Sequence, residues 1–183
     1  LLTKKDGKLE AEALRPTLFV PMTGKAEAKR IVKPDPANPT IVNSGFEEVP
    51  GENGHVPGWY YQRQQYWEPA AEARADAIRG DHYITFRNED MGRVSHAMQG
   101  FAIDGRKVKS LEVSAFVRTK DVLWGKTPDV RPMVVVTLYD EQRKMLGSWW
   151  LGPWHGDTLW HQKKKVLRIP PTAREGIIRI GLF

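Results

Sequence analysis

Leu111-Glu112-Val113-Ser114-Ala115-Phe116-Val117-Arg118 is the stretch of this chain in which side-chain character alternates most regularly. Small or branched apolar residues occupy every odd position from 111 to 117. Successive side chains of a β-strand point to opposite faces, so these four residues lie on one face. We therefore expect a strand within residues 108–120, with the odd positions in a core and with Phe116 and Arg118 facing away from it.

Eight further segments are short, rich in apolar or β-branched residues and bounded by turn residues. They are residues 40–42, 59–67, 83–87, 92–101, 133–139, 145–150, 163–169 and 176–183. Many short strands at this spacing are typical of a sandwich or a barrel. The segment 133–139 is almost entirely apolar, which suits a central strand, and only residues 69–79 have the composition of a short helix. The sequence predicts an all-β fold.

Length and proline content predict how the chain is divided. With 183 residues and 40% hydrophobic residues, the chain can build one core plus a modest extension. Three prolines within residues 33–39 exclude a helix or a central strand there. We expect residues 1–37 to be an N-terminal extended segment, either a linker or a hairpin formed around 18–20 and 31–32, and residues 38–183 to be the main domain.

Charge and cysteine content restrict the partners. Lys and Arg number 28 against 22 Asp and Glu, a net charge of +6, and the compact run Lys163-Lys164-Lys165 is a solvated strand edge or a polyanion contact. The absence of cysteine excludes disulfides and thiolate metal sites. No apolar run is long enough to predict a membrane span. The first residues contain neither a Met nor a signal core, so we expect neighbouring domains of a longer chain.

Two short motifs open the predicted main domain. Asn43-Ser44-Gly45-Phe46-Glu47-Glu48 precedes Pro57-Gly58-Trp59, and the segments 93–101, 104–106, 111–118 and 177–183 follow in order. In this order they resemble the carbohydrate-binding modules of families 4, 9 and 22, which have a galactose-binding-domain-like fold. The similarity covers about residues 40–183. It implies a jelly-roll β-sandwich of two antiparallel sheets, and an extracellular, cell-surface or periplasmic location.

The resembling family also closes with a strand of the W/V-F-D-D-V type, which this sequence lacks. We therefore expect the domain of residues 38–183 to be without its last strand. The family's packing positions correspond to Trp59 and Trp160, so we expect both rings in the core. Trp124 lies in the loop of residues 121–128, where it either overhangs a groove or anchors the loop.

Sugar binding requires flat aromatic surfaces for the C–H faces of pyranose rings and planar polar side chains for the hydroxyl groups. Seven Trp, five Tyr and six Phe are present, several of them beside Gln or Arg in predicted strands. Period-2 alternation places several such residues together if their strands are neighbours in one sheet. The candidate sugar-binding residues are Tyr60, Gln62, Tyr66, Phe116, Arg118, Tyr139 and the outward member of Trp149 and Trp150. The alternative is that these rings pack under the N-terminal extension or pair across strands.

A structural calcium ion is a further implication of the resemblance. In the family a backbone oxygen and a carboxylate of the N-x-G-F-E element bind the ion, and these positions correspond to Gly45 and Glu47, with Asp81 as a further candidate ligand. Calcium takes six to eight oxygen ligands, so two positions do not define a site by themselves. The alternative is that Glu47 is an ordinary turn carboxylate.

Catalytic patterns are missing from the sequence. No nucleophile elbow, zinc-protease helix, phosphate loop or dinucleotide fingerprint occurs, and the five histidines have no ligand spacing. Glu47 and Glu48 are adjacent and point apart, and Asp140-Glu141 has the composition of a hairpin turn. We expect a non-catalytic module that binds a polysaccharide or oligosaccharide. The alternative is a structural or interaction domain of a larger secreted or surface protein, and nucleic-acid binding is the least favoured hypothesis.

Overall fold

The computed structural model describes residues 2–5, 8–11, 35–69, 80–88, 93–123 and 131–183. Within these ranges the regular secondary structure is entirely β, which confirms the all-β prediction. The chain divides into two compact units, Leu1–Lys33 and Pro34–Phe183. No helix in the described part of the chain is long and apolar enough to cross a membrane.

The first unit contains one antiparallel pair. Strand β1 (Leu2–Lys5) pairs with β2 (Lys8–Ala11), with Leu2 opposite Ala11. The sequence analysis missed this pair, although Asp6-Gly7 is a common two-residue signal for a hairpin. The predicted extended segments 18–20 and 31–32 lie outside the described residues, as does almost all of the predicted helix at 69–79.

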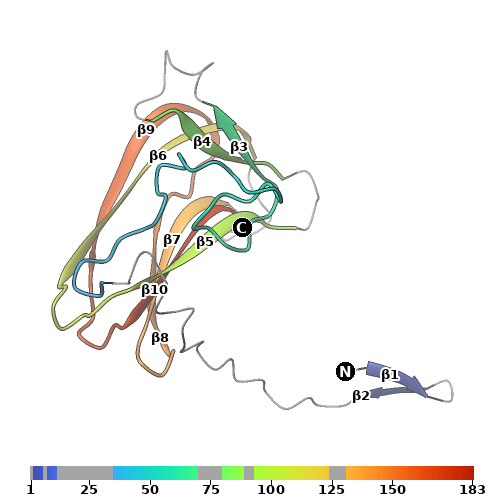
Figure 1. The fold of residues 1–183 in the computed structure, drawn as a ribbon, viewed down its shortest axis with the longest axis horizontal. Coiled ribbons are helices and arrows are strands. Elements are labelled where there is room, and N and C mark those ends of the chain that lie inside the picture. The colour runs from blue at the N-terminus through green and yellow to red at the C-terminus, as the bar shows by residue number, and fades with distance from the viewer. Residues whose placement is uncertain (1, 6–7, 12–34, 70–79, 89–92, 124–130) are drawn as a thin grey trace. The chain divides into compact units, whose positions relative to one another are not determined.

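The larger unit contains a four-stranded antiparallel sheet (Figure 1). Its strands, in spatial order, are β5 (Ser95–Ala102), β10 (Glu175–Leu182), β7 (Pro132–Tyr139) and β8 (Met145–Leu151). Strand β7 has a partner on both sides, which confirms its predicted central position.

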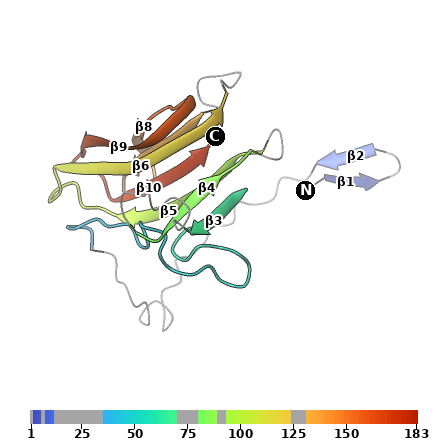
Figure 2. The ribbon, with the colours of Figure 1, turned by 90° about the horizontal axis from the view of Figure 1, so that it is seen from above.

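Two further antiparallel pairs complete the larger unit. Strand β3 (Gln65–Pro69) pairs with β4 (His82–Phe86), and β6 (Ser110–Val122) pairs with β9 (Gly156–Arg168). Figure 2 shows the two long strands, β6 and β9, side by side. The antiparallel sheets are consistent with a β-sandwich.

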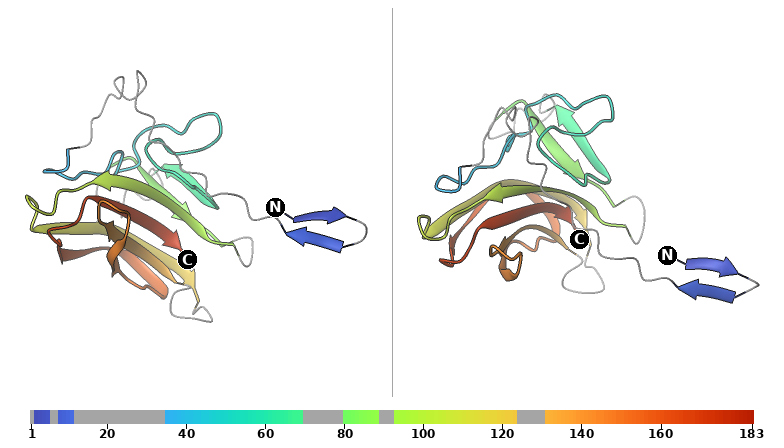
Figure 3. Two further views of the ribbon diagram at one scale, coloured as in Figure 1. Left: turned by 90° about the horizontal axis from the view of Figure 1, so that it is seen from below. Right: turned by 60° about the horizontal axis from the view of Figure 1, so that its bottom comes forward.

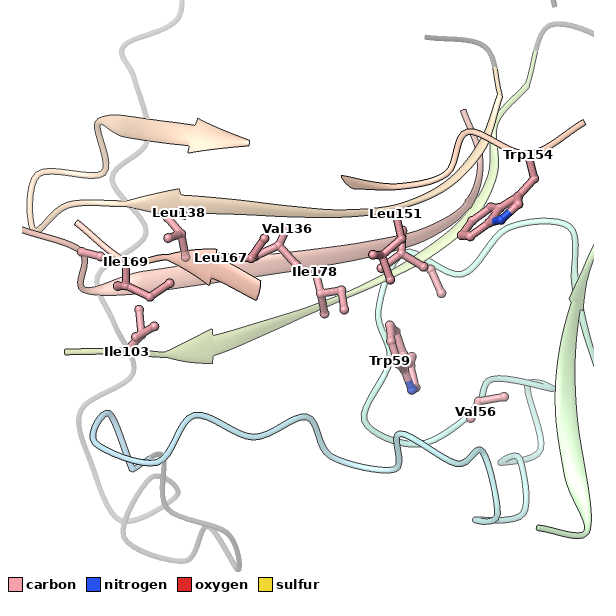
Figure 4. Close-up of a cluster of buried hydrophobic side chains, with 13 residues drawn as sticks. Val56, Trp59, Ile103, Val136, Leu138, Leu151, Trp154, Leu167, Ile169 and Ile178 are labelled. Carbon is pink, nitrogen blue, oxygen red and sulfur yellow. The ribbon is translucent and has the colours of Figure 1, made fainter. Parts of the chain in front are cut away.

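One apolar core joins the inner faces of all three sheets. The apolar residues at positions 111, 113, 115 and 117 of β6 pack against it, as predicted, and so do Trp67 and Ile84 from β3 and β4. The four-stranded sheet contributes Val136 and Leu138, which project into the cluster in Figure 4. Trp59 is 6% exposed, which confirms its predicted core position. Removing such apolar area from water stabilises the fold by about 25 cal/mol per Å².

The segment of residues 35–64 reaches the sheets without forming regular strands (Figure 3). The predicted strand at 40–42 is wrong, and the one at 59–67 is regular only from Gln65 onward; Tyr60 contributes a single bridge to Met98. Tyr61 and Gln64 have positive φ angles, 51° and 48°, so the backbone is not extended at these two residues. Period-2 alternation therefore does not hold across this segment.

A buried side-chain amide holds this irregular segment to the sheet. Gln99 of β5 is 4% exposed, and its Oε1 accepts a hydrogen bond from the Val42 amide at 2.6 Å. Its Nε2 donates to the carbonyl of Val42 at 3.0 Å and to that of Gly58 at 2.8 Å. The amide thus satisfies backbone groups that a strand ladder would otherwise satisfy.

A second polar cluster forms at Asp104, which is buried beside two arginines. Its carboxylate accepts hydrogen bonds from the Arg106 amide and Nε at 3.0 and 2.9 Å, and Arg174 Nη1 lies 3.5 Å away. The hydrogen bonds from Arg106, more than any other contact, lower the pKa of Asp104 from 3.8 to about 2.

Replacement of Gln99 tests the first of these clusters. Gln99→Leu removes the partner of one amide and two carbonyls that are partly buried, so we expect the free energy of unfolding to fall by roughly 1–3 kcal/mol. Chemical denaturation measures this change. Gln142→Leu, at an exposed turn position, is the matched control and is expected to stay within about 0.5 kcal/mol of the parent. Equal effects of the two substitutions would contradict this assignment.

Replacement of Asp104 tests the second cluster through pH. The folded-state pKa lies below the unfolded value, so the stabilisation by Asp104 is fully present above about pH 4 and is lost as pH falls toward 2. We expect Asp104→Asn to be less stable than the parent at pH 7 and to lose this part of the acid dependence. Thermal melts between pH 2 and 7 measure it, with the exposed Glu48→Gln as control. If the melting temperature of Asp104→Asn falls with decreasing pH as steeply as that of the parent, Asp104 does not have this role.

Candidate functional site

The outward face of β6 and β9 carries aromatic and polar side chains. Because the odd positions of β6 enter the core, Phe116 and Arg118 point the other way. The strand register places Gln162 of β9 opposite Phe116. Trp160 of β9 lies beside Arg118, whose guanidinium carbon is 5.4 Å from the indole ring centroid. Two neighbouring strands therefore present rings and hydrogen-bonding groups together.

The outward face of β3 and β4 has the same character. Trp67 and Ile84 are register partners that both pack on the core, so the residues next to them in sequence face outward. These neighbours are Tyr66 and Glu68 on β3 and Tyr83 on β4. The same alternation that turns an indole and an isoleucine toward the core thus turns two phenol rings and a carboxylate away from it.

Ring contacts join the two strand pairs. The rings of Tyr83 and Trp160 meet edge to face, with centroids 5.7 Å apart and an interplanar angle of 79°. Arg118 is within cation–π range of both rings, at 5.9 Å from Tyr83 and 5.4 Å from Trp160. Strands β4, β6 and β9 therefore meet at one aromatic cluster around a guanidinium group.

Glu68 organises the other end of this surface. Its Oε2 accepts a hydrogen bond from the Tyr83 hydroxyl at 2.9 Å, and its Oε1 accepts one from Arg87 Nη2 at 2.6 Å. The Arg87 guanidinium carbon lies 4.6 Å from the centroid of the Tyr66 ring. These contacts hold two rings and one guanidinium in defined orientations, which lowers the entropic cost of binding a ligand.

We call this surface the outer aromatic face and define it by eight residues. They are Tyr66, Glu68, Tyr83, Arg87, Phe116, Arg118, Trp160 and Gln162. The four rings are half-buried, whereas the Arg87, Arg118 and Gln162 side chains are exposed. The face therefore combines firmly held apolar ring surface with accessible planar hydrogen-bonding groups, and it suits a ligand with both apolar and hydroxylated surfaces.

Three of the predicted sugar-binding residues, Tyr66, Phe116 and Arg118, lie on this face. Three others belong to the four-stranded sheet or its edge: Tyr139 pairs with Glu175 across β7 and β10, Trp150 pairs with Val135, and Tyr60 bridges Met98. The strands that carry these rings are therefore not neighbours in one sheet, so the condition for a single aromatic floor is not met.

Two further predicted residues are directed inward. Gln62 is 9% exposed, and its amide is saturated by the backbone of Val56 and Trp59, so it is unavailable to a ligand. Trp149 packs against the core, whereas Trp150 is 49% exposed with Lys165 Nζ 5.8 Å from its ring centroid. One member of the pair faces outward, as predicted, but on the four-stranded sheet.

The sequence analysis misplaced Trp160 and missed four members of the outer aromatic face. Trp160 was expected in the core, yet its ring contacts Tyr83 and Arg118 on the outward side. The missed residues are Glu68, Tyr83, Arg87 and Gln162. The sequence does contain a signal for two of them. If Trp67 and Ile84 are assigned to the core, alternation along each strand predicts that Glu68 and Tyr83 face outward. Trp124 lies outside the described residues.

Glu47 accepts hydrogen bonds from the residues at the start of β4. Its Oε1 accepts hydrogen bonds from the amides of Asp81 and His82 at 3.0 and 3.3 Å, and its Oε2 lies 3.0 Å from His82 Nδ1. Gly45 lies against the Glu47 side chain. Within the described ranges no three His, Asp or Glu residues gather in a way that could hold a metal. The carboxylate anchors the start of β4, and the calcium site stays a prediction.

Comparison with known proteins adds no assignment, because no protein-family model matches the chain and no curated protein matches its sequence.

The hydrogen bond between Glu68 and Tyr83 can be tested by titration. Burial of the ring and, after it, the bond to Glu68 raise the pKa of Tyr83 above 10.0. We expect Glu68→Gln to lower this pKa while leaving it somewhat elevated, because burial persists. Alkaline absorbance titration measures it, and subtraction of Tyr83→Phe isolates the transition. If Glu68→Gln titrates like the parent, the two side chains are not coupled.

Proposed function

We propose that the domain of residues 38–183 is a non-catalytic carbohydrate-binding module that holds a polysaccharide or oligosaccharide on the outer aromatic face. The observation that carries this proposal is the cluster of Tyr83, Trp160 and Arg118, where two strand pairs combine their rings around one guanidinium. A pyranose ring has an apolar C–H face and a rim of hydroxyls, and this cluster is complementary to both.

The contacts of the side chains on the outer aromatic face indicate a different role in binding for each kind of residue. Phe116 and Trp160 are half-buried rings on adjacent strands, so they offer apolar platforms with little conformational freedom to lose. Gln162 and Arg87 present planar donors beside the platforms, and Glu68 supplies an acceptor already held in place by Tyr83 and Arg87. Sugar hydroxyls can pair with both kinds of group.

The wider proposal follows the family resemblance. It includes the jelly-roll form of the β-sandwich, a location outside the cytoplasm, at the cell surface or in the periplasm, and a structural calcium at Gly45 and Glu47. A module of this kind acts by tethering an attached enzyme or neighbouring domain to a glycan. The tether raises the local concentration of that enzyme or domain at the glycan.

An interaction domain that binds no sugar is the second candidate, and exposed apolar side chains outside the outer aromatic face favour it. Met145 and Trp150 of the edge strand β8 are each about half exposed or more, and so is Tyr60 at the opposite edge, beside β5. Exposed apolar side chains of this kind are typical of protein contacts. Nucleic-acid binding is supported less well, because Glu68 lies on the outer aromatic face where a phosphate-tracking groove would need positive charge.

Substitution of platform rings tests the proposal. We expect Phe116→Ala to weaken glycan binding by about 2 kcal/mol, roughly thirtyfold, because one of the two apolar platform rings is lost. Trp160→Ala is expected to have a similar effect. Affinity electrophoresis on polysaccharides chosen by a glycan-array screen measures binding, and thermal melts establish that each variant is folded.

Trp150→Ala is the matched aromatic control, because it removes an exposed ring from the four-stranded sheet. We expect it to bind glycan as the parent does. A parent that retains no glycan, or folded Phe116→Ala and Trp160→Ala variants with unchanged retention, would refute binding at this face. Loss of retention in Trp150→Ala alone would move the site to the other sheet.

A further inference from the structure

We propose that the ligand of the outer aromatic face is an acidic glycan, and that Arg118 binds the anionic group, a carboxylate or a sulfate ester, on one of its sugars. This inference rests on the proposed function and specifies its substrate class.

Two carboxylates on the outward faces of the four strands are paired with cations. Glu68 is paired with Arg87 at 2.6 Å, and Glu112 lies 3.8 Å from Lys164. Each of these carboxylates therefore already has a cationic neighbour. Arg118 forms no ion pair with any residue in the described part of the chain, so its guanidinium lies beside the two rings without a described carboxylate partner.

Arg118 differs in this respect from several other arginines of the domain. Arg106 and Arg174 pair with Asp104, and Arg143 pairs with Glu175. The described neighbours of the Arg118 guanidinium are instead the Tyr83 and Trp160 rings, which approach it from two strands. A cation held by rings is oriented without being neutralised.

The chemistry of a guanidinium group then selects the ligand. Its planar set of N–H donors matches the two oxygens of a carboxylate or a sulfate, and such paired, charge-assisted hydrogen bonds are stronger than those to neutral hydroxyls. The rings beside it are the platforms proposed for the pyranose, so an acidic substituent and its sugar ring would be bound by adjacent groups. The net charge of +6 favours approach of a polyanion.

The experiment measures selectivity on the whole chain. A glycan array with neutral, uronate-bearing and sulfated oligosaccharides identifies the best-bound backbone, and calorimetry then compares its neutral and acidic forms at low salt. We expect the acidic form to bind at least about tenfold more tightly, because hydrogen bonds to charged groups are the stronger ones. We expect this ratio to shrink with increasing salt. Comparing the affinities of the uronate-bearing and sulfated oligosaccharides shows whether the bound anionic group is a carboxylate or a sulfate.

The Arg118→Gln variant is expected to reduce the acidic-to-neutral ratio to about one. Arg118→Lys keeps the charge but lacks the planar fork, so an intermediate ratio is expected, and this variant serves if Arg118→Gln does not fold. Lys144→Gln, which removes one exposed charge from the turn between β7 and β8, is the matched control and should leave the ratio unchanged.

Four outcomes would overturn the inference. Glycans that bind without preference for acidic forms, or an unchanged ratio in folded Arg118→Gln, would exclude the role of Arg118 while leaving carbohydrate binding intact. An equal loss in Lys144→Gln would show that net charge, rather than Arg118, produces the preference. If no spot on the array binds the parent, the proposed function fails together with this inference.

Discussion

The alternation of β6 against its partner β9 is the constraint on which the rest of the domain depends. Burying the odd positions from 111 to 117 determines which face of β6 meets the core, and a slip of one residue would exchange the two faces. The antiparallel register then places Gln162 beside Phe116. The composition of the outer aromatic face is thus a consequence of core packing.

Hydrogen bonds from side-chain amides hold the irregular segment of residues 35–64 in place, whereas backbone hydrogen bonds between neighbours hold the strands. Gln99 bonds to Val42 and Gly58, and Gln62 bonds to Val56 and Trp59. Each glutamine has donors and an acceptor on one short planar group, so it can satisfy backbone groups that no strand ladder pairs. This arrangement lets Trp59 reach the core although no regular strand carries it there.

The two outer surfaces of the domain differ in a way that suggests different partners. The outer aromatic face has rings ordered by hydrogen bonds and cations, notably around Glu68 and Arg118, which suits a hydroxylated ligand. The edge strand β8 of the four-stranded sheet exposes Met145 and Trp150, which suits contact with another protein surface. A module that holds a glycan on one surface could therefore dock to a neighbouring domain through the other, and the two hypotheses for this chain need not exclude each other.

The sequence by itself determined the all-β class, the inward stripe of β6, the central position of β7 and the outward direction of Phe116 and Arg118. These features follow from period-2 alternation and β-branched composition, which act between neighbouring residues. Local pattern could not reveal that Tyr61 and Gln64 leave the extended conformation, so Gln62 was assigned to the wrong environment.

Only the tertiary structure decided which rings share a surface. Tyr83 and Trp160 meet around Arg118 although 77 residues separate them in sequence, whereas Phe116 and Tyr139, which are much closer in sequence, lie on different sheets. Strand pairing and the packing of sheets set these distances, and both depend on long-range burial of apolar area that no single segment encodes. The local sequence pattern therefore predicted most strands and the inner face of β6, whereas the packing of the sheets determined which side chains form the candidate site.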